Sequence, residues 1–245
     1  MEVNMSDPTS FWVYLATSPL LGLTLTLGAY TLAHAIHVRC RFSPLANPVA
    51  IAILLIGSAL SLMNMSYERY FSGAQFVHFL LGPATVALAI PLARQLPRVR
   101  KVILPTLFAL FAGSFTAIVS SVMLVKMFGG STLLALSIGP KSATTPIAMA
   151  ASQQLGGIPA LTAVLVISTG IVGAITARFL FDLLGIKSAE ARGFALGVAS
   201  HGIGTARAIQ VSPAMGAFAV LGMGLNGVLT AILAPWLVPL LMTHF

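Results

Sequence analysis

Charged side chains are scarce in this sequence. Only 13 Lys and Arg residues and 5 Asp and Glu residues occur among 245, while hydrophobic residues make up 58%. A soluble domain carries charge on roughly a quarter of its residues, so a chain with 7% charged residues cannot cover a water-facing surface. The composition therefore predicts a single membrane domain over residues 1–245, embedded in a lipid bilayer, with no soluble module.

Cysteine and the common cofactor motifs are also missing. The single Cys40 excludes an intramolecular disulfide and any CxxC metal or redox motif. No group of His, Cys, Asp and Glu has the spacing of metal ligands, and no Walker or dinucleotide-binding glycine pattern is present. Basic residues do not gather with aromatic residues as they do in nucleic-acid-binding proteins. We therefore expect no metal, no cofactor and no nucleic-acid partner.

Acidic residues are the scarcest charged group, and all of them lie near predicted helix ends. A carrier that binds a cation on a buried carboxylate would place an acid inside a transmembrane segment, so cation exchange is disfavoured. Sodium bound by backbone carbonyls stays open, because it needs no acid. The five acids are Glu2, Asp7, Glu68, Asp182 and Glu190.

Long stretches without charged residues fill most of the chain. Most of them reach the roughly 20 residues that a helix needs to cross a bilayer. They predict an all-α integral membrane protein with seven or eight transmembrane elements, the number depending on whether residues 131–155 span or re-enter. The uncharged stretches are 8–38, 42–67, 70–93, 102–125, 127–140, 142–177, 193–206 and 208–245.

Basic residues in the connections indicate the orientation. Four of them lie in one short connection at 94–101, and Arg39 and Arg41 lie two helices earlier, on the same predicted side. Cytoplasmic loops are enriched in Lys and Arg, so these connections face the cytoplasm and the acidic N-terminus faces outward. The expected location is the bacterial cytoplasmic (inner) membrane, in a multi-pass arrangement.

Helix-breaking residues interrupt several of the apolar stretches. Thr145-Pro146 is typical of a helix start and Gly156-Gly157 of a helix stop. The helix between them would have about 10 residues and a length of roughly 15 Å, half of a bilayer, which favours re-entry. Further breaks are predicted at Gly82, Pro83, Gly139, Pro140, Gly202 and Gly204.

The breaks near 82 and 202 suggest that the chain has two related halves, 1–128 and 129–245. Broken segments at matching positions of two halves are typical of transporters with internal repeats. With residues 131–155 re-entrant, the two broken segments run in opposite directions. The sequence therefore predicts an inverted repeat and an elevator-like transporter architecture.

Two polar stretches interrupt the apolar sequence of the second half. Residues 138–146 read IGPKSATTP and residues 199–208 read ASHGIGTARA, so each holds one cation, several hydroxyls and helix-breaking residues. A Lys or Arg at the bilayer centre costs about 2.5–3.5 kcal/mol, and neither stretch contains an acid to pair with Lys141 or Arg207. We therefore predict that a mobile organic anion balances these two cations.

The predicted substrate site combines these cations with nearby hydroxyls and one imidazole. Lys141 and Arg207 would hold the substrate carboxylate, and His201 is a candidate proton site. A helix N-terminus at Thr145 would add unpaired N–H groups and the positive end of a dipole. The site residues are Lys141, Ser142, Thr144, Thr145, Ser200, His201, Thr205 and Arg207.

Simpler interpretations stay open for parts of this site. A Lys or Arg near the end of a span can extend to the lipid headgroups, and small residues can serve helix packing alone. Catalysis by Ser200 and His201 is disfavoured, because no carboxylate is available to orient the imidazole. We therefore expect a protein that is not an enzyme.

Four blocks of the sequence resemble the LrgB/CidB family. They are LLGPATVALAIPL at 80–92, PKSATTPIAM at 140–149, GGIPALTAV at 156–164 and ARGFALGVASHGIGTARA at 191–208. Ala143 departs from the pattern, since the family more often has Val there.

The resemblance implies two different activities. Bacterial members are named as holin-like or antiholin-like modulators of murein hydrolase export and autolysis, paired with a small LrgA/CidA-type membrane partner. A plastid relative is a glycolate/glycerate transporter, and some bacterial members are tied to pyruvate uptake.

Of these two activities, the residues favour transport over the modulation of autolysis. We expect a carrier, often a homodimer in such proteins, that moves small monocarboxylates such as glycolate, glycerate, lactate or pyruvate by alternating access. The alternative is a holin-like or antiholin-like modulator of autolysis. The carboxylate, the coupling ion and the direction of transport are left open by the sequence.

Overall fold

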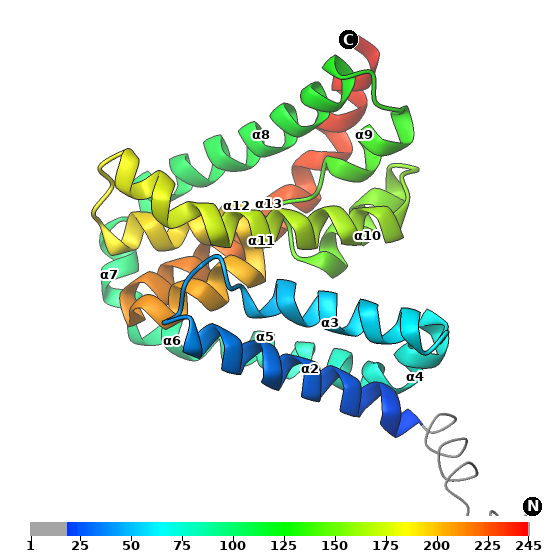
Figure 1. Cartoon of the computed structure of the whole chain (residues 1–245). Coiled ribbons are helices and arrows are strands. Elements are labelled where there is room, and N and C mark those ends of the chain that lie inside the picture. The colour runs from blue at the N-terminus through cyan, green and yellow to red at the C-terminus, as the bar shows by residue number, and fades with distance from the viewer. Residues whose placement is uncertain (1–18, 245) are drawn as a thin grey trace, which may run out of the picture. The chain divides into compact units, whose positions relative to one another are not determined.

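A computed structural model describes residues 19–244, and every regular element in this range is an α-helix (Figure 1). Glu2 and Asp7, on which the predicted orientation partly rests, lie outside the described residues. The helices are α2 (Pro19–Arg39), α3 (Pro48–Leu62), α4 (Tyr67–Phe79), α5 (Leu81–Ala87), α6 (Ala89–Arg94), α7 (Leu96–Lys101), α8 (Ile103–Met127), α9 (Thr132–Ile138), α10 (Thr145–Gln154), α11 (Pro159–Leu183), α12 (Ala189–Val211) and α13 (Pro213–His244).

Four helices in the described range are long and apolar enough to cross a membrane. They occupy Leu20–Arg39, Ile103–Met127, Pro159–Leu183 and Pro213–Thr243. The other apolar stretches fold as shorter helices, such as Pro48–Leu62. The all-helical class is therefore confirmed, while the seven or eight crossings, the inverted repeat and the elevator architecture remain predictions.

The chain divides into two compact units, Met1–Ala87 and Leu88–Phe245. The sequence predicts one domain with halves 1–128 and 129–245, which stays a prediction; the boundary between the compact units is a different one. It lies within the run 70–93, which the structure divides into α4, α5 and α6. The second unit contains both polar stretches singled out in the sequence.

In the first unit, α2 packs closely on α4. A Cβ at Gly22 would lie 2.1 Å from the backbone oxygen of Tyr70, so only glycine allows this approach. The Thr26 and Tyr70 hydroxyls lie 2.8 Å apart and share a hydrogen bond. Helix α4 ends at Phe79, with Leu80 as its C-cap residue, and the predicted breakers Gly82 and Pro83 lie in the first turn of α5.

In the second unit, three long helices form the frame. The Lys126 ammonium donates to the backbone oxygens of Leu241 and Met242, at 3.3 and 3.4 Å, so α8 and α13 end side by side, as Figure 1 shows. Further along the same two helices, Val122 packs with Val238 in a buried apolar cluster. Helix α11 is the third long helix, and a hairpin lies on each side of it in the chain.

The first hairpin consists of α9, the loop 139–144 and α10. Helix α10 starts at Thr145 with Pro146 in its first turn and has 10 residues, which confirms the predicted short helix. The backbone N–H of Ile158 donates to Ser137 Oγ at 2.9 Å, and the Thr162 hydroxyl donates to Ser137 O at 2.9 Å. The Thr162 hydroxyl also lies 2.7 Å from Ser152 Oγ, so the end of α9 and the end of α10 both lie beside the N-terminal end of α11.

The second hairpin lies within α12, which reverses at His201. This residue has φ 40° and ψ −129°, whereas the rest of the element is helical. A Cβ at Gly204 would lie 2.7 Å from Leu196 O, although residues eight apart in a straight helix are separated by about 12 Å. The legs are therefore 189–200 and 202–211. The sequence places the break at Gly202 and Gly204; instead, both belong to the returning leg, and Gly204 lets the legs touch.

The base of the second hairpin lies at the C-terminal end of α11. Leu196 on the outgoing leg and Ala208 on the returning leg pack in one cluster with Phe181 of α11. Arg192 Nε donates to Ile186 O at 2.6 Å, in the turn that follows α11. Since the first hairpin has its base at the other end of α11, the two hairpins enter the unit from opposite ends.

The outgoing leg of the second hairpin rests directly on the backbone of α13. A Cβ at Gly193 would lie 2.1 Å from Met215 O, and one at Gly197 would lie 2.0 Å from Ala219 O. Small residues allow such close helix packing within membranes. Glycine at these positions therefore fixes how the leg sits on α13.

We predict that Gly197→Ala lowers the free energy of unfolding by about 1–3 kcal/mol, the usual cost of overpacking. Gly224→Ala is the matched control, because nothing lies within 4 Å of a Cβ at Gly224 and alanine favours a helix by up to about 1 kcal/mol over glycine. Thermal unfolding of the purified chain in detergent measures both. Equal melting temperatures for the two variants would contradict the close contact.

Candidate functional site

The tips of the two hairpins meet at a cavity of about 840 Å³ in the second unit. Its wall comes from α8, the loop of the first hairpin, α11 and the outgoing leg of the second hairpin. The lining is mostly apolar, with one cation and four hydroxyls. The polar lining residues are Lys141, Ser142, Ser168, Thr169 and Ser200.

The cavity lies level with the middle of the long helices. Gly113 and Ala117 line it from the centre of the 25-residue α8, and Thr169 and Gly173 line it from the centre of the 25-residue α11. Lys141 faces the same cavity. A lysine that extends to the headgroups would lie at a helix end. The position of Lys141 therefore favours the interpretation as a buried cation over extension to the headgroups.

Lys141 has no acidic partner in the part of the chain that the structure describes. The ion pairs found there all involve Asp182, which pairs with Arg178 and Arg192. The Lys141 side chain is partly buried and lines the cavity wall. An ammonium group in an apolar setting is costly unless it is paired, so this cation is suited to bind an anion.

Ser200 offers a second binding group at the same cavity. The residue is only 1% exposed, and its Oγ has no hydrogen-bond partner among the described residues. It fits there because α11 has a glycine opposite: a Cβ at Gly173 would lie 1.8 Å from Ser200 Oγ. Buried hydroxyls are normally paired, so Ser200 is suited to hydrogen-bond a ligand.

His201 and Thr205 hold the reversal of the second hairpin. His201 Nε2 donates to Val166 O at 2.9 Å, and it carries a proton because a carbonyl can only accept. Gly170 makes room for the ring, since a Cβ there would lie 2.8 Å from His201 Cε1. The Thr205 hydroxyl donates to His201 O at 2.7 Å. Neither residue lines the cavity; their hydrogen bonds hold the backbone directly after Ser200.

Thr144 and Thr145 lie at the start of α10 and are partly buried. They do not line the cavity, but they follow Lys141 and Ser142 directly. Thr144 is the N-cap residue, and its side chain makes no capping hydrogen bond. Gly139 and Pro140 are buried in the loop before them, where they separate α9 from α10 as predicted.

Arg207 lies in a different pocket from Lys141. That pocket is lined by Arg178, Lys187, Arg192 and Arg207, among others. The predicted pairing of Lys141 and Arg207 around one carboxylate is therefore not what the structure shows. Because the chain reverses at His201, the returning leg carries Arg207 away from the cavity and back toward the hairpin base.

Asn226 connects the tips of both hairpins, and the sequence interpretation missed it. This fully buried residue of α13 donates from Nδ2 to Ser142 O at 2.8 Å and to Val198 O at 3.0 Å. Its Oδ1 accepts a hydrogen bond from the Ser114 hydroxyl of α8. An amide in the middle of the apolar run 208–245 is the signal that could have revealed it, since polar residues in such runs are costly.

Comparisons with known proteins give one consistent result. The family model described as LrgB-like matches residues 26–240. The Holin-like protein CidB of Staphylococcus epidermidis is 33% identical over 223 residues, which is 89% of this chain and 95% of that protein. The Antiholin-like protein LrgB of Bacillus mycoides is 31% identical over 222 residues, 91% of this chain and 96% of the relative. An uncharacterized protein of Haemophilus influenzae is 35% identical over 220 residues, 89% of this chain and 94% of its own. No solved structure matches the chain.

We predict that Asn226→Val loosens both hairpin tips. Each buried polar group that loses its partner costs about 1–3 kcal/mol, so the free energy of unfolding falls by at least about 2 kcal/mol, and amide hydrogen exchange speeds up in 139–144 and 198–202. Thr230→Val is the control, since Thr230 is also buried and contacts Asn226 only at 3.5 Å. Unchanged exchange in both segments would show that Asn226 does not hold the tips.

Proposed function

The chain belongs to the LrgB-like family, and on that premise we propose that it is a membrane carrier for small monocarboxylates. The observation that carries the proposal is the unpaired Lys141 ammonium at the cavity where the two hairpin tips meet. A bound carboxylate supplies the negative charge that the surrounding residues lack. One cation at the cavity favours an anion with a single charge.

The neighbouring groups suit the rest of such a ligand. Ser200 Oγ has a free hydrogen-bonding capacity beside Lys141, and it serves the second oxygen of the carboxylate. Ser168 and Thr169 on α11 reach a hydroxyl or keto oxygen next to the carboxylate. Glycolate, glycerate, lactate and pyruvate all have an oxygen at that position.

The opposed directions of the hairpins support alternating access. One hairpin starts at the N-terminal end of α11 and the other at its C-terminal end, so movement of either tip opens the cavity toward a different end. In this proposal the carrier works in an elevator-like manner, as a homodimer in the inner membrane.

A second candidate function comes from the relatives. Their printed names, Holin-like protein CidB and Antiholin-like protein LrgB, point to a holin-like or antiholin-like role more directly than to transport. In this alternative the chain modulates murein hydrolase export and autolysis together with a small LrgA/CidA-type membrane partner. Four apolar helices and these names are both consistent with a membrane protein.

We predict that the purified chain in liposomes accumulates at least one of these acids with saturable kinetics, and that Lys141→Ala lowers uptake at least about tenfold. A hydrogen bond to a charged group contributes about 1.5–3 kcal/mol, which corresponds to roughly ten- to hundredfold. Lys101→Ala, an exposed site in α7, should retain full uptake. Uptake by Lys141→Ala at the wild-type rate would contradict the assignment of Lys141 to the substrate site.

The same vesicles separate the two candidate functions. Under the transport proposal, a fluorescent solute of several hundred daltons stays trapped, with or without an LrgA/CidA-type partner in the membrane. Release of that solute, together with equal behaviour of wild type and Lys141→Ala, would favour the holin-like alternative. The measurement is the fluorescence of dye-loaded vesicles over time.

A further inference from the structure

A second pocket lies at the base of the second hairpin, apart from the Lys141 cavity. Its volume is about 340 Å³, and four cationic side chains from different segments line it. Arg178 comes from α11, Lys187 from the turn after it, Arg192 from the outgoing leg and Arg207 from the returning leg. We propose that this pocket binds the phosphate group of an anionic ligand.

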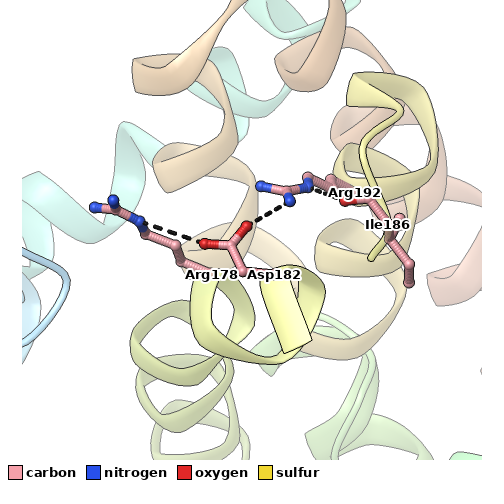
Figure 2. A network of polar contacts seen from close by, with 4 residues as sticks. All are labelled: Arg178, Asp182, Ile186 and Arg192. Carbon is pink, nitrogen blue, oxygen red and sulfur yellow. Dashed lines mark hydrogen bonds and ion pairs between the residues drawn. The ribbon is translucent and has the colours of Figure 1, made fainter. Parts of the chain in front are cut away.

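Only one acid offsets the four cations. Asp182 lies 2.6 Å from Arg192 and 3.9 Å from Arg178, and Figure 2 shows its carboxylate between the two guanidinium groups. Lys187 and Arg207 have no carboxylate within 4.0 Å in the described part of the chain. Arg207 Nη1 donates only to the neutral Gln210, at 3.4 Å. The four cations and Asp182 together leave a net charge of three positive units.

The remaining charges suit a phosphate better than a monocarboxylate. A phosphate offers more acceptor oxygens than a carboxylate and carries up to two negative charges. Guanidinium groups bind such oxygens in pairs. Arg192 is held in place by its bonds to Ile186 O and Asp182, so part of the pocket is already ordered before a ligand arrives.

The positive-inside rule does not account for this arrangement. Topology needs basic residues in a connection, and Lys187 alone would serve that purpose. It does not require Arg178 of α11 and Arg207 of the returning leg to face the same pocket. Their convergence is a property of the fold and points to a ligand.

The other lining residues indicate what the phosphate is attached to. Ala174, Phe181, Leu196 and Met215 form an apolar wall beside the cations. Anionic lipids bind basic pockets between transmembrane helices, and such a wall suits an acyl chain. A soluble phosphate compound would use the cations alone.

Binding there would also join the two legs of the hairpin. Arg192 and Arg207 belong to opposite legs, and Arg178 of α11 lines the same pocket. The like charges in this pocket repel each other. A phosphate bound between them replaces this repulsion by attraction. The ligand thus stabilises the base of the hairpin whose tip carries Ser200, whether or not the cavity binds a monocarboxylate.

The test uses the full chain in detergent, with native mass spectrometry and thermal unfolding. Phosphatidylglycerol should stay bound and raise the melting temperature, while zwitterionic phosphatidylcholine should not. Arg207→Gln combined with Lys187→Gln should reduce the retention of phosphatidylglycerol about tenfold, because charge-assisted hydrogen bonds to its phosphate are lost. Arg100→Gln combined with Lys101→Gln makes the same charge change on α7 and should leave retention unchanged.

Asp182→Asn acts in the opposite direction and should strengthen the retention of phosphatidylglycerol, since it removes the one acid that pairs with the cations of this pocket in the described part of the chain.

A parallel measurement with inorganic phosphate, at constant ionic strength, distinguishes a soluble ligand from a lipid. Stabilisation by phosphate alone assigns a soluble compound, and stabilisation by phosphatidylglycerol alone assigns a lipid. The proposal is overturned if neither stabilises the chain, or if pocket and control variants lose retention equally. Should the double variant fail to fold, the direction of the Asp182→Asn effect decides.

Discussion

The second unit depends on how it satisfies backbone groups where its helices are interrupted. A helix that ends or reverses leaves carbonyl and N–H groups without partners, and in an apolar interior each one is costly. The unit meets this requirement with buried side chains: Asn226 takes up Ser142 O and Val198 O, and Thr205 takes up His201 O. Because the Asn226 bonds come from α13, and His201 in turn binds Val166 O of α11, both hairpin tips can lie among the long helices.

Composition and local signals in the sequence account for much of this fold. Scarce charge predicts a helical membrane protein, and Thr145-Pro146 predicts the start of α10. Lys141, Ser142 and Ser200, taken from two distant stretches, do line one cavity. Each of these predictions depends on the chemistry of a few neighbouring residues, which the sequence displays directly.

Other features depend on contacts that no local pattern contains. The reversal at His201 has a backbone conformation that favours glycine, so the neighbouring Gly202 is the natural but incorrect place to expect it. That one-residue reversal sends Arg207 to the hairpin base, and a linear sequence cannot show the change in direction. Asn226 finds its partners 84 and 28 residues away, beyond any motif. The count of crossings stays a prediction for a related reason, because hydropathy measures the length of a segment and not whether it returns.

The glycine contacts between the second hairpin and α13 have a mechanical consequence. Helices that meet through long side chains can slide, because rotamers adjust to a new register. Gly193 and Gly197 instead place backbone against backbone, where no rotamer is available to adjust. The outgoing leg and the first turns of α13 are thus interlocked and move as one rigid body. Relative motion within the unit is left to the faces toward α8, α11 and the first hairpin, where side chains form the contacts.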